Sequence, residues 1–359
     1  MDLTFDQSIT ERDWEVETDG TVRFALVGLG WFTRDFALPA LEECAYAEAT
    51  VVVSGSAEKA ETVADEHGLA AGITYGEFHD GAATDEYDAV YVGTPNAVHL
   101  EHVEAAAEYG KHVLCEKPLE ATAERAAAMV DACEDAGVEL MVAYRLHTEP
   151  PIRRAREVIQ SGVIGDVYQA AGACAGPFVS RDGPRGWRTD PDLAGGGALY
   201  DLGVYPLNTI RFLLDDDPQS LHGTVVRDHD FLDGMDLHAS FTMDFGDGVT
   251  VSCRTSYDTE MEDTISVLGT EGRLFLDPAY EAGAPKTLRI VQGGEELGQV
   301  GEEVELTAGG NEVREEFDYF ANAILADRDV GPDGEMGLFD MRVLEAIYES
   351  DETGRRVDL

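Results

Sequence analysis

The stretch "VRFALVGLG", residues 22–30, decides the fold class of this chain. An apolar run typical of a buried strand leads directly into Gly28 and Gly30. Gly28 permits a tight turn, and Gly30 lets backbone N–H groups approach a pyrophosphate at the start of a helix. Thr33 stands where the third glycine of a GxGxxG pattern would fall. The stretch predicts a nucleotide-binding loop, and the alternative is a glycine-rich turn that holds no ligand.

Short apolar segments alternate with alanine-rich helical segments from residue 21 to about residue 145. Near-continuous apolar runs such as 51–53 suit strands that are buried on both faces, as in a parallel sheet. The helical segments end in glycine, the usual residue just past a helix. These repeats predict a doubly wound α/β domain of the Rossmann type. Its strands are expected at 22–28, 49–55, 88–94, 111–117 and 138–144.

The pattern changes after about residue 150 to long alternating strands. Apolar and polar residues alternate on both sides of the turn "GDG" within 237–257, which predicts an antiparallel hairpin. Residues 263–277 predict a second hairpin, and helices near 312–326 and 336–349 close the chain. We therefore expect an acidic N-terminal extension over 1–20, a dinucleotide-binding domain over 21–148 and an α+β domain over 149–359. The second domain should hold an open-faced, mixed, largely antiparallel sheet, and its C-terminal helices have the option of packing back on the first domain.

Carboxylates dominate the composition, with 72 acidic residues against 25 basic ones and a net charge of −47. They are spread between well-patterned apolar segments, which predicts a folded protein with a carboxylate-coated surface rather than a disordered acidic tail. Such a surface repels itself at low salt, whereas at molar salt the Debye length is only about 3 Å. We expect a halophilic protein, with a mesophilic acidic protein as the alternative. Binding of nucleic acid through a basic face is excluded.

The five cysteines form no CxxC pair, which predicts reduced and mostly packed thiols. No apolar run has the length of a membrane span, and the N-terminus lacks the basic start and apolar stretch of a signal peptide. We expect a cytoplasmic protein without membrane contact. His99 and His102 share a helix face, but no third ligand accompanies them, so no metal site is predicted.

The end of the second predicted strand, "VVVSGSAEKA" (51–60), bears on the cofactor. NAD enzymes usually place Asp or Glu there to hold the ribose 2′-hydroxyl. Here Ser54, Gly55 and Ser56 are followed by Lys59, one of only four lysines. Hydroxyls and an ammonium group would bind a 2′-phosphate that a carboxylate would repel, which favours NADP over NAD. The alternative is that Ser56 only caps the next helix and Lys59 is an ordinary surface residue.

Three further residues form a candidate reaction centre. Lys117 follows the strand 111–117 within "CEKP", at the same carboxyl edge of the sheet as "TPN..H" (94–99), where ligands bind in such folds. Asp201 and Tyr205 are four residues apart in "GGGALYDLGVYPLN" and would share a helix face, with Pro206 as a kink. The alternative is a glycine-rich loop that leads into a core helix, with Tyr205 simply buried.

These motifs together resemble the glucose–fructose oxidoreductase/inositol dehydrogenase (Gfo/Idh/MocA) family over about residues 21–350. "VSGSAEKA" and "YPLN" resemble its NADP-using sugar oxidoreductases, since the inositol branch has His where Tyr205 stands. The resemblance implies oxidation of an aldopentose at C1 to the lactone with NADP, and D-xylose is the first candidate. It also implies an exposed sheet face that pairs subunits into a homodimer or homotetramer.

The resemblance assigns the catalytic roles to Lys117, Asp201 and Tyr205. A tyrosine hydroxyl ordinarily ionises near pH 10, so Tyr205 can act as general base if the ammonium of Lys117 favours its phenolate. Asp201 would hold Lys117 or a sugar hydroxyl. Tyr144, Arg145 and His147 close the first domain near the cleft and are candidates for contact with the sugar or the cofactor, with core or surface roles as the equal alternative. Contacts with NADP are expected from Gly28, Leu29, Gly30, Trp31, Phe32, Ser54, Gly55, Ser56, Lys59, Thr94, Pro95, Asn96, His99, Glu116, Lys117, Trp187 and Arg188.

Two other functions compete with a dehydrogenase. A non-catalytic NADP-binding regulator would use the open sheet to hold a partner protein, but it has no need to retain Lys117, Asp201 and Tyr205 together. An oxidoreductase that keeps its NADP bound and interconverts two sugars resembles a branch with a secretion signal and an N-terminal arm. Residues 1–20 lack that signal and are short, although they can still form an arm.

Overall fold

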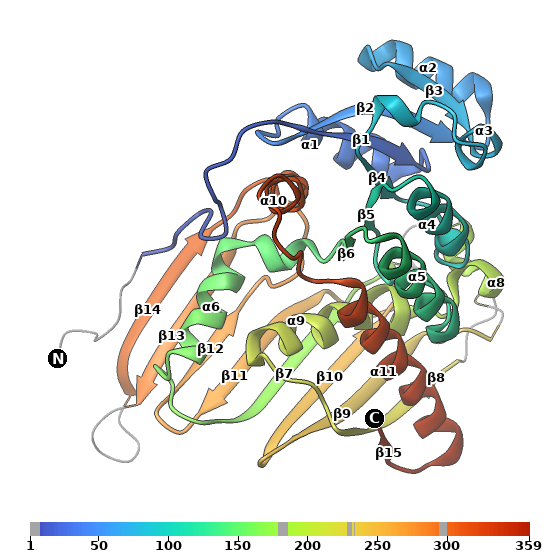
Figure 1. Cartoon of the computed structure of the whole chain (residues 1–359). Coiled ribbons are helices and arrows are strands. Elements are labelled where there is room, and N and C mark those ends of the chain that lie inside the picture. Colours follow the sequence, from blue (N-terminus) through green and yellow to red (C-terminus); the bar gives the residue numbers. More distant parts are fainter. Residues whose placement is uncertain (1–7, 179–185, 228–231, 233, 294–299) are drawn as a thin grey trace.

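The computed structural model describes residues 8–178, 186–227, 232, 234–293 and 300–359. Residues 1–7 of the predicted extension lie outside the described residues. Two sheets, one of six strands and one of nine, organise the described chain (Figure 1). The Rossmann-type domain and the open-sheet domain predicted from the sequence are both present.

Six parallel strands form the first sheet in the order β3-β2-β1-β4-β5-β6. Five of them were predicted, whereas β3 was not, because "AGIT" is short and only half-buried and lacks the apolar run of the others. The order reverses beside β1, so the loops after β1 and β4 meet at the carboxyl edge. The strands are β1 (Val22–Val27), β2 (Ala47–Ser54), β3 (Ala71–Thr74), β4 (Ala89–Val92), β5 (His112–Cys115) and β6 (Leu140–Val142).

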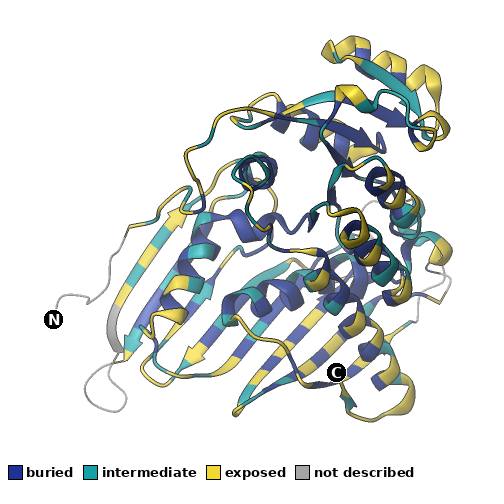
Figure 2. Ribbon diagram, in the orientation of Figure 1, coloured by how far each residue is buried: buried dark blue, intermediate teal, exposed yellow. Residues whose placement is uncertain are grey.

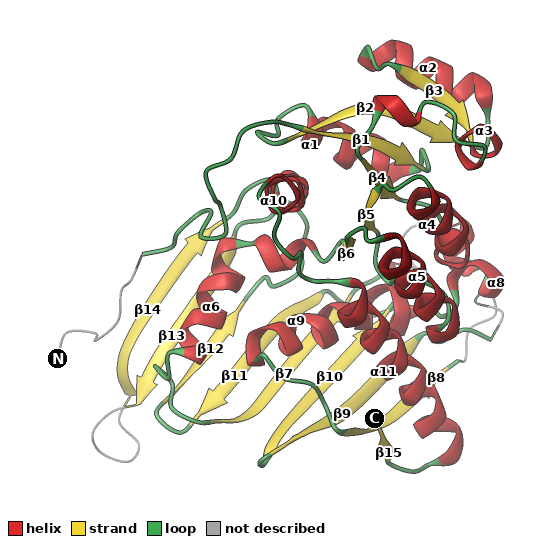
Figure 3. Ribbon diagram, in the orientation of Figure 1, coloured by secondary structure: helices red, strands yellow, loops and turns green. Residues whose placement is uncertain are grey.

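Helices cover both faces of this sheet, so its strands are buried on both sides (Figures 1 and 3). Leu26 of β1 packs into the core under η1 (Thr33–Ala37), α1 (Leu38–Leu41) and α2 (Ala57–His67). Val27 packs into the opposite core. As the terminal glycines predicted, Gly68 and Gly137 adopt left-handed conformations just past α2 and α5. The remaining helices of this domain are α3 (Tyr75–His79), η2 (Thr84–Glu86), η3 (Asn96–Val98), α4 (His99–Glu108) and α5 (Ala123–Ala136).

The second sheet has the order β14-β13-β12-β11-β7-β10-β9-β8-β15. β7 and β10 pair in parallel and the other described neighbours are antiparallel, so the sheet is mixed and largely antiparallel as predicted. The two predicted hairpins are β9–β10 and β11–β12. The strands are β7 (Val167–Ala175), β8 (Ser220–Val226), β9 (His238–Gly246), β10 (Val249–Ser256), β11 (Glu262–Gly269), β12 (Gly272–Leu276), β13 (Lys286–Gly293), β14 (Val300–Ala308) and β15 (Val357–Asp358).

Helices α6 (Pro150–Gln160), α9 (Val204–Leu214) and α11 (Gly334–Thr353) cover the face of this sheet that looks towards the first domain (Figure 1). α9 approaches closely because Gly172 of β7 lacks a side chain: a Cβ there would lie 2.7 Å from Pro206 Cβ. Tyr205, next to Pro206, is thereby held near the junction of the two domains. Shorter helices of this half are η4 (Arg145–Thr148), η5 (Gly186–Thr189), α8 (Pro191–Ala194) and η6 (Leu199–Gly203).

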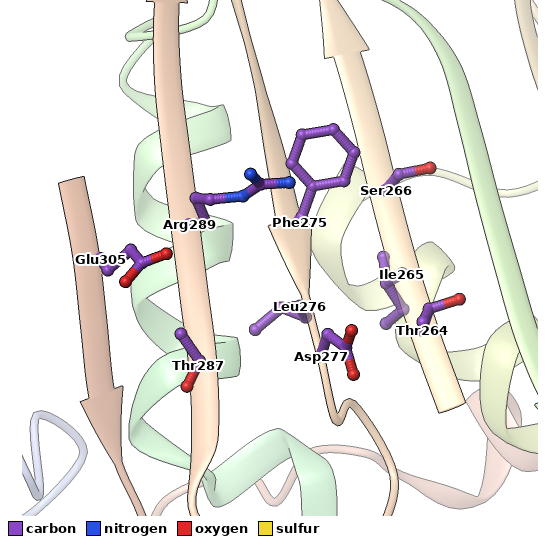
Figure 4. Close-up of a pocket in the computed structure, with 9 residues that line it drawn as sticks. All are labelled: Thr264, Ile265, Ser266, Phe275, Leu276, Asp277, Thr287, Arg289 and Glu305. Atoms are coloured by element: carbon purple, nitrogen blue, oxygen red, sulfur yellow. The ribbon is translucent and has the colours of Figure 1, made fainter. Parts of the chain in front are cut away.

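The opposite face of the second sheet is largely exposed, so buried and exposed residues alternate along its strands (Figure 2). A hollow of about 520 Å³ lies on this outer face across β11 to β14 (Figure 4). Because the site residues below lie on the inner side, the hollow is separated from them by the sheet itself. Its lining residues are Thr264, Ile265, Ser266, Phe275, Leu276, Asp277, Thr287, Arg289 and Glu305.

The two C-terminal helices contact the first domain. α10 (Glu312–Leu325) packs on β1, where Phe317 meets Phe24 edge to face at 5.1 Å between ring centres. α11 contacts α5 and β6. The described part of the N-terminal extension lies along α10, and Arg12 pairs with the buried carboxylate of Asp318 at 2.7 Å. Within the described ranges, no helix has the combination of length and apolar character that crossing a membrane requires.

Candidate active site

The loop that joins β1 to η1 turns at Gly28, whose φ is +96°. A side chain at this position would place its Cβ 2.7 Å from the carbonyl oxygen of Gly93, so only glycine fits. At Gly30 the same Cβ would meet no atom within 4 Å. The loop is therefore closed at its base and open where the N–H groups of a helix start can meet a phosphate.

Thr33 occupies the place of the third glycine without blocking the turn. In the usual pattern that glycine allows a helix to pack closely on a strand. Here Thr33 is fully buried, and its hydroxyl oxygen lies 2.9 Å from the point where a Cβ of Gly93 would stand. The glycine that provides the space thus lies after β4 instead of in the helix, which explains how the loop tolerates the departure from GxGxxG.

Aromatic side chains line the outer part of the loop. Trp31 is 65% exposed and meets Phe36 edge to face at 5.0 Å between ring centres. Phe32 stacks on Phe36 at 5.3 Å. Trp31 and Phe32, both expected to contact the cofactor, thus belong to a half-exposed aromatic group beside the glycine loop.

The end of β2 carries hydroxyl groups and no carboxylate. Ser54 is buried and accepts a hydrogen bond from the Ser56 N–H at 3.3 Å. The Ser56 side chain caps α2 by accepting from the Lys59 N–H at 3.3 Å, as the alternative interpretation anticipated. The Lys59 ammonium group reaches back to the Leu29 carbonyl of the glycine loop. The ammonium group therefore lies beside the glycine loop, while the Lys59 residue as a whole stays exposed at the surface.

The turn after β4 is held from behind by His99. The imidazole of His99 is fully buried, with Nε2 3.0 Å from the Thr94 carbonyl and Nδ1 2.9 Å from the Leu119 carbonyl. Both ring nitrogens therefore face backbone carbonyls. Direct contact of the His99 side chain with a cofactor was expected, but the structure shows the side chain supporting the loop from behind instead. Asn96 is also buried and donates to the Ala194 carbonyl at 2.8 Å, while Pro95 is half-buried in the same turn.

Glu116 lies at the end of β5 and connects two strands. Its carboxylate accepts from the Tyr91 hydroxyl at 2.8 Å and from the Lys117 N–H at 3.2 Å. Burial and the charge of Glu116 raise the pKa of Tyr91 well above its usual value. The Lys117–Pro118 peptide bond is cis.

Lys117, Asp201 and Tyr205 meet in space. The Lys117 ammonium nitrogen donates to the Asp201 carbonyl oxygen at 2.8 Å and lies 3.3 Å from its carboxylate oxygen Oδ1. The same nitrogen lies 4.5 Å from the centre of the Tyr205 ring. Burial lowers the pKa of Lys117, but the charges of Tyr205, Asp201 and Glu116 outweigh it, so the net shift is upward. Lys117 therefore stays charged in its buried position.

Asp201 is held ionised by the groups around it. Its second oxygen, Oδ2, accepts from the Tyr257 hydroxyl at 3.0 Å and lies 3.5 Å from Arg188 Nε. Burial raises the pKa of Asp201, but Lys117, Arg188 and the Tyr257 hydrogen bond together hold it well below its usual range. Tyr257, at the end of β10, was missed in the sequence, because nothing in a hairpin pattern marks its last residue as part of a site.

The local backbone differs from the single kinked helix that was expected. Asp201 lies in η6, a π-helical turn, and Tyr205 lies in the first turn of α9, where Pro206 needs no N–H partner. The preceding glycines bring this turn against Asp236: a Cβ on Gly197 would stand 2.0 Å from the Asp236 carbonyl oxygen. The buried Asp236 carboxylate accepts from the Gly197 N–H at 2.8 Å and the Leu199 N–H at 2.7 Å. Asp236 thus fixes the start of the segment, a role that sequence spacing alone did not reveal.

Trp187 and Arg188, in η5, lie at the same place. The Arg188 guanidinium carbon is 4.5 Å from the centre of the Trp187 ring, and its Nε faces Asp201. Both side chains are half-buried. The structure thus brings this predicted pair to the carboxylate that also binds Lys117.

The three residues proposed for sugar contact are all buried. His147 is bonded through Nε2 to Asn208 Oδ1 at 2.6 Å and stacks on Phe212 at 4.0 Å between ring centres. Burial lowers the pKa of His147 to about 3, so it is a neutral core residue. Tyr144, 2% exposed, packs beside it. His147 and Tyr144 thus occupy the core positions that were the alternative to ligand contact, whereas Arg145 lies beside the Tyr205 ring.

The described histidines and the cysteines do not gather into a metal-binding group. His102 turns to His79, with 3.0 Å between ring nitrogens, and does not converge with His99. Across the described ranges there is no group of three or more His, Cys, Asp or Glu side chains arranged to hold a metal ion. All five cysteines are unpaired, and burial raises the pKa of Cys115, the one nearest to Lys117 in sequence.

Comparisons with known proteins give both domains a relative. Residues 22–144 match a family model described as an oxidoreductase family with an NAD-binding Rossmann fold. Residues 152–275 match the GFO/IDH/MocA C-terminal domain. Together the two matches cover more than half of the chain and include Lys117, Asp201 and Tyr205.

Similar proteins cover nearly the whole length. The chain is 44% identical to the D-xylose 1-dehydrogenase [NADP(+)] of Haloarcula marismortui over 97% of this chain and 96% of the relative. It is 34% identical to D-xylose 1-dehydrogenase (NADP(+)) 2 of Haloferax volcanii over 94% and 99%. Among solved structures, the aldose-aldose oxidoreductase of Caulobacter crescentus, complexed with glycerol, has a TM-score of 0.86 at 30% identity and covers 94% and 100%.

Proposed function

The chain belongs to the GFO/IDH/MocA oxidoreductase family, and on that premise we propose that it oxidises an aldopentose, D-xylose first, at C1 with NADP as acceptor. The observation that carries the proposal is the contact of Lys117 with both Asp201 and Tyr205. A buried ammonium beside a tyrosine and a carboxylate is the arrangement that proton transfer from a sugar hydroxyl requires. The two haloarchaeal relatives, both D-xylose 1-dehydrogenases that use NADP, support this substrate and cofactor.

The residues present fit a dinucleotide. The backbone is open at Gly30, while Gly28 closes the turn beneath it. No carboxylate stands at the end of β2, where Ser54 and Ser56 offer hydroxyls and Lys59 an ammonium group. A 2′-phosphate carries negative charge, so this combination favours NADP over NAD.

Within the site, each residue has a distinct task. A bound nicotinamide supplies the acceptor for the hydride that leaves C1 of the sugar. Tyr205, as phenolate, takes the proton of the C1 hydroxyl, and the electron pair of that O–H bond becomes part of the lactone carbonyl. Lys117 favours the phenolate through its charge, since an opposite charge at this distance stabilises the ionised form. Asp201 keeps Lys117 in place with its carbonyl and carboxylate oxygens.

The test is the initial rate of NADPH formation in molar KCl with D-xylose, D-glucose and L-arabinose, each against NADP and NAD. We expect the highest kcat/KM for D-xylose with NADP. A higher kcat/KM for another sugar would identify that sugar as the preferred substrate and would leave the proposed mechanism unchanged. No reduction with any of the three sugars, in a folded protein that binds NADP, would reject the dehydrogenase.

A second function has one observation in its favour. The solved structure that resembles this chain at a TM-score of 0.86 is described as an aldose-aldose oxidoreductase, which favours transfer of hydride between two sugars. An enzyme of that kind would keep its NADP bound between the two half-reactions. The described part of the N-terminal extension packs on α10 of the same chain through Arg12 and Asp318. Retention of NADP through gel filtration, with turnover of a sugar pair but no free NADPH, would favour this function.

We also propose that the outer face of the second sheet joins two copies of the chain. The hollow on this face contains Phe275, whose ring lies 4.6 Å from the Arg289 guanidinium carbon. A paired face would cover these half-buried groups. Light scattering after gel filtration in molar KCl should give a dimer or tetramer, and Arg289→Glu should shift the mass towards the monomer. A wild-type protein that is monomeric at all concentrations would contradict the pairing.

A further inference from the structure

Tyr205 has a cation on each of two sides. The Lys117 ammonium nitrogen lies 4.5 Å from the ring centre, and the Arg145 guanidinium carbon lies 5.1 Å from it. The mechanism above uses Lys117 and leaves Arg145 without a task.

Arg145 is fixed from the second domain. It begins η4, just after β6, and is only 7% exposed. One of its nitrogens pairs with the carboxylate of Glu312, at the start of α10, and another donates to the Tyr280 carbonyl at 2.6 Å. Burial lowers the pKa of Arg145, but Tyr205 and Glu312 outweigh it and raise it above its usual value. The guanidinium group is therefore held charged against the Tyr205 ring.

Arg145 belongs to a buried group of four charges, the Arg145 cluster, made of Arg145, Lys286, Glu312 and Glu149. Lys286 donates to Glu312 at 2.9 Å and lies 3.8 Å from Glu149. Burial and the charge of Glu312 raise the pKa of Glu149 to about 8. Arg145 and Lys286 therefore share the carboxylate of Glu312, with Glu149 beside Lys286.

A positive charge of this kind has a definite effect on a neighbouring hydroxyl. An opposite charge within about 4–6 Å favours the ionised form of a group by about one to three pH units. We propose that Arg145 is a positioning residue that, together with Lys117, favours the phenolate of Tyr205, and this inference rests on the proposed function. Glu312 limits the effect by neutralising part of the guanidinium charge.

Other titratable groups surround Arg145 and Tyr205, and they come from several elements of both domains. Lys117 and Asp201 are already paired with each other, and burial, with the charge of Glu116, raises the pKa of Glu316 of α10 well above its usual value. The titratable groups around Arg145 and Tyr205 are Lys117, Tyr144, Glu149, Cys174, Tyr280, Glu312 and Glu316, and Glu116 and Asp201 lie next to Lys117.

The test uses the dependence of kcat/KM on pH. In Arg145→Gln, the rising limb of the pH profile of kcat/KM for sugar oxidation should move to higher pH by about one unit, because the phenolate loses a neighbouring cation. Arg145→Lys keeps the charge and should restore the wild-type limb. Glu312→Gln frees Arg145 from its counter-charge, so the limb should move to lower pH. Opposite shifts from two partners of one ion pair do not follow from a general loosening of the fold.

A second readout needs neither cofactor nor sugar. Tyrosinate formation is followed by near-ultraviolet absorbance, and the spectrum of the matching Tyr205→Phe protein is subtracted. Ionisation of Tyr205 should move to higher pH in Arg145→Gln and to lower pH in Glu312→Gln. If the wild-type protein oxidises none of the sugars, the proposed function falls, whereas this titration still decides the task of Arg145.

Arg12→Gln is the control, since it also removes an arginine from a buried carboxylate, that of Asp318, on another part of α10. It should lower the Tm and leave the limb in place. A folded Arg145→Gln protein with both titrations unchanged would overturn the proposal, and so would an equal shift in Arg12→Gln. If Arg145→Gln does not fold, the Glu312→Gln variant decides. A rising limb of its pH profile that stays in place, or that moves to higher pH, would overturn the proposal as well.

Discussion

Lys117 and Asp201, 84 positions apart in the chain, are joined by two contacts: 2.8 Å from the ammonium nitrogen to the Asp201 carbonyl and 3.3 Å to its carboxylate. The first residue follows a strand of the Rossmann sheet, and the second lies in a π-helical turn on the open sheet. The pair therefore exists only when the two domains are in place. It also explains why a lysine stands here in a chain that has only four.

Replacing Lys117 should remove catalysis and leave the fold. Lys117→Met is expected to lower kcat/KM by about 10²–10⁴-fold, because Tyr205 loses a neighbouring cation and the reacting oxygen loses a donor. Lys111→Met is the control, since Lys111 instead binds the carbonyls of Thr84 and Tyr87, each at 2.8 Å. It should lower the Tm and leave kcat/KM near that of the wild type. Full activity in a folded Lys117→Met protein would reject the mechanism.

A carboxylate at the end of β2 should change the cofactor preference. Ser54→Asp is expected to reduce kcat/KM for NADP by about tenfold or more, about 1.4 kcal/mol per tenfold, through repulsion of the 2′-phosphate. Lys59→Met should weaken NADP in the same direction by removing an attractive charge. NAD, which lacks the phosphate, is the internal control and should change less. An unaltered NADP-to-NAD ratio in both variants would mean that the phosphate binds elsewhere.

Glu149 should make stability depend on pH. Burial foremost, and the charge of Glu312, raise its pKa to about 8, against the lowering effect of Lys286 and Arg145. Since this is above the unfolded value of about 4.3, the folded state holds the proton more tightly. The resulting stabilisation is fully present below the unfolded pKa and is lost as the pH rises through about 8.

Glu149→Gln cannot titrate and isolates this contribution. From pH 5 to pH 9, the Tm of the wild type should fall relative to that of the variant, measured by calorimetry in molar KCl. A difference that stays constant over this range, or that grows in favour of the wild type, would contradict the pKa direction.

High salt should raise the thermal stability of the protein. With a net charge of −47, repulsion between surface carboxylates opposes compaction at low ionic strength. Raising the salt from 0.15 M to 1 M shortens the Debye length from about 8 Å to about 3 Å and screens that repulsion. The Tm should rise steadily with KCl, while equal osmolality of sucrose serves as the uncharged control. A Tm that falls with KCl would identify an ordinary acidic protein.

Most of the fold was predictable from local patterns. The run 51–53 and the glycine after β1 identified a parallel sheet, and the alternation around "GDG" identified the hairpin β9–β10. β3 was not predicted, because its four half-buried residues show no periodic alternation of apolar and polar side chains. The order of the nine-stranded sheet, with β7 paired in parallel to β10, joins strands that are far apart in sequence and have no local signature.

The site was predictable where residue type carries the chemistry. Lys117 after a strand and Asp201 four positions before Tyr205 were visible as motifs, and the structure brings all three together. His99 was misplaced because a motif does not reveal whether an imidazole faces a ligand or two backbone carbonyls. Tyr257 was missed because it stands in no motif, and only its contact with Asp201 in the folded chain makes it part of the site.

The sequence by itself determined the two-domain class, the glycine cradle, the lack of a carboxylate at the end of β2 and the surface charge. These follow from periodicity, from the special backbone of glycine and from counting charges, all of which are local or additive. Only the tertiary structure decided that Arg145 joins Lys117 at Tyr205 and that Glu312, 167 positions from Arg145, holds it there. Such pairs depend on which side chains are buried together, and burial is a property of the packed chain as a whole.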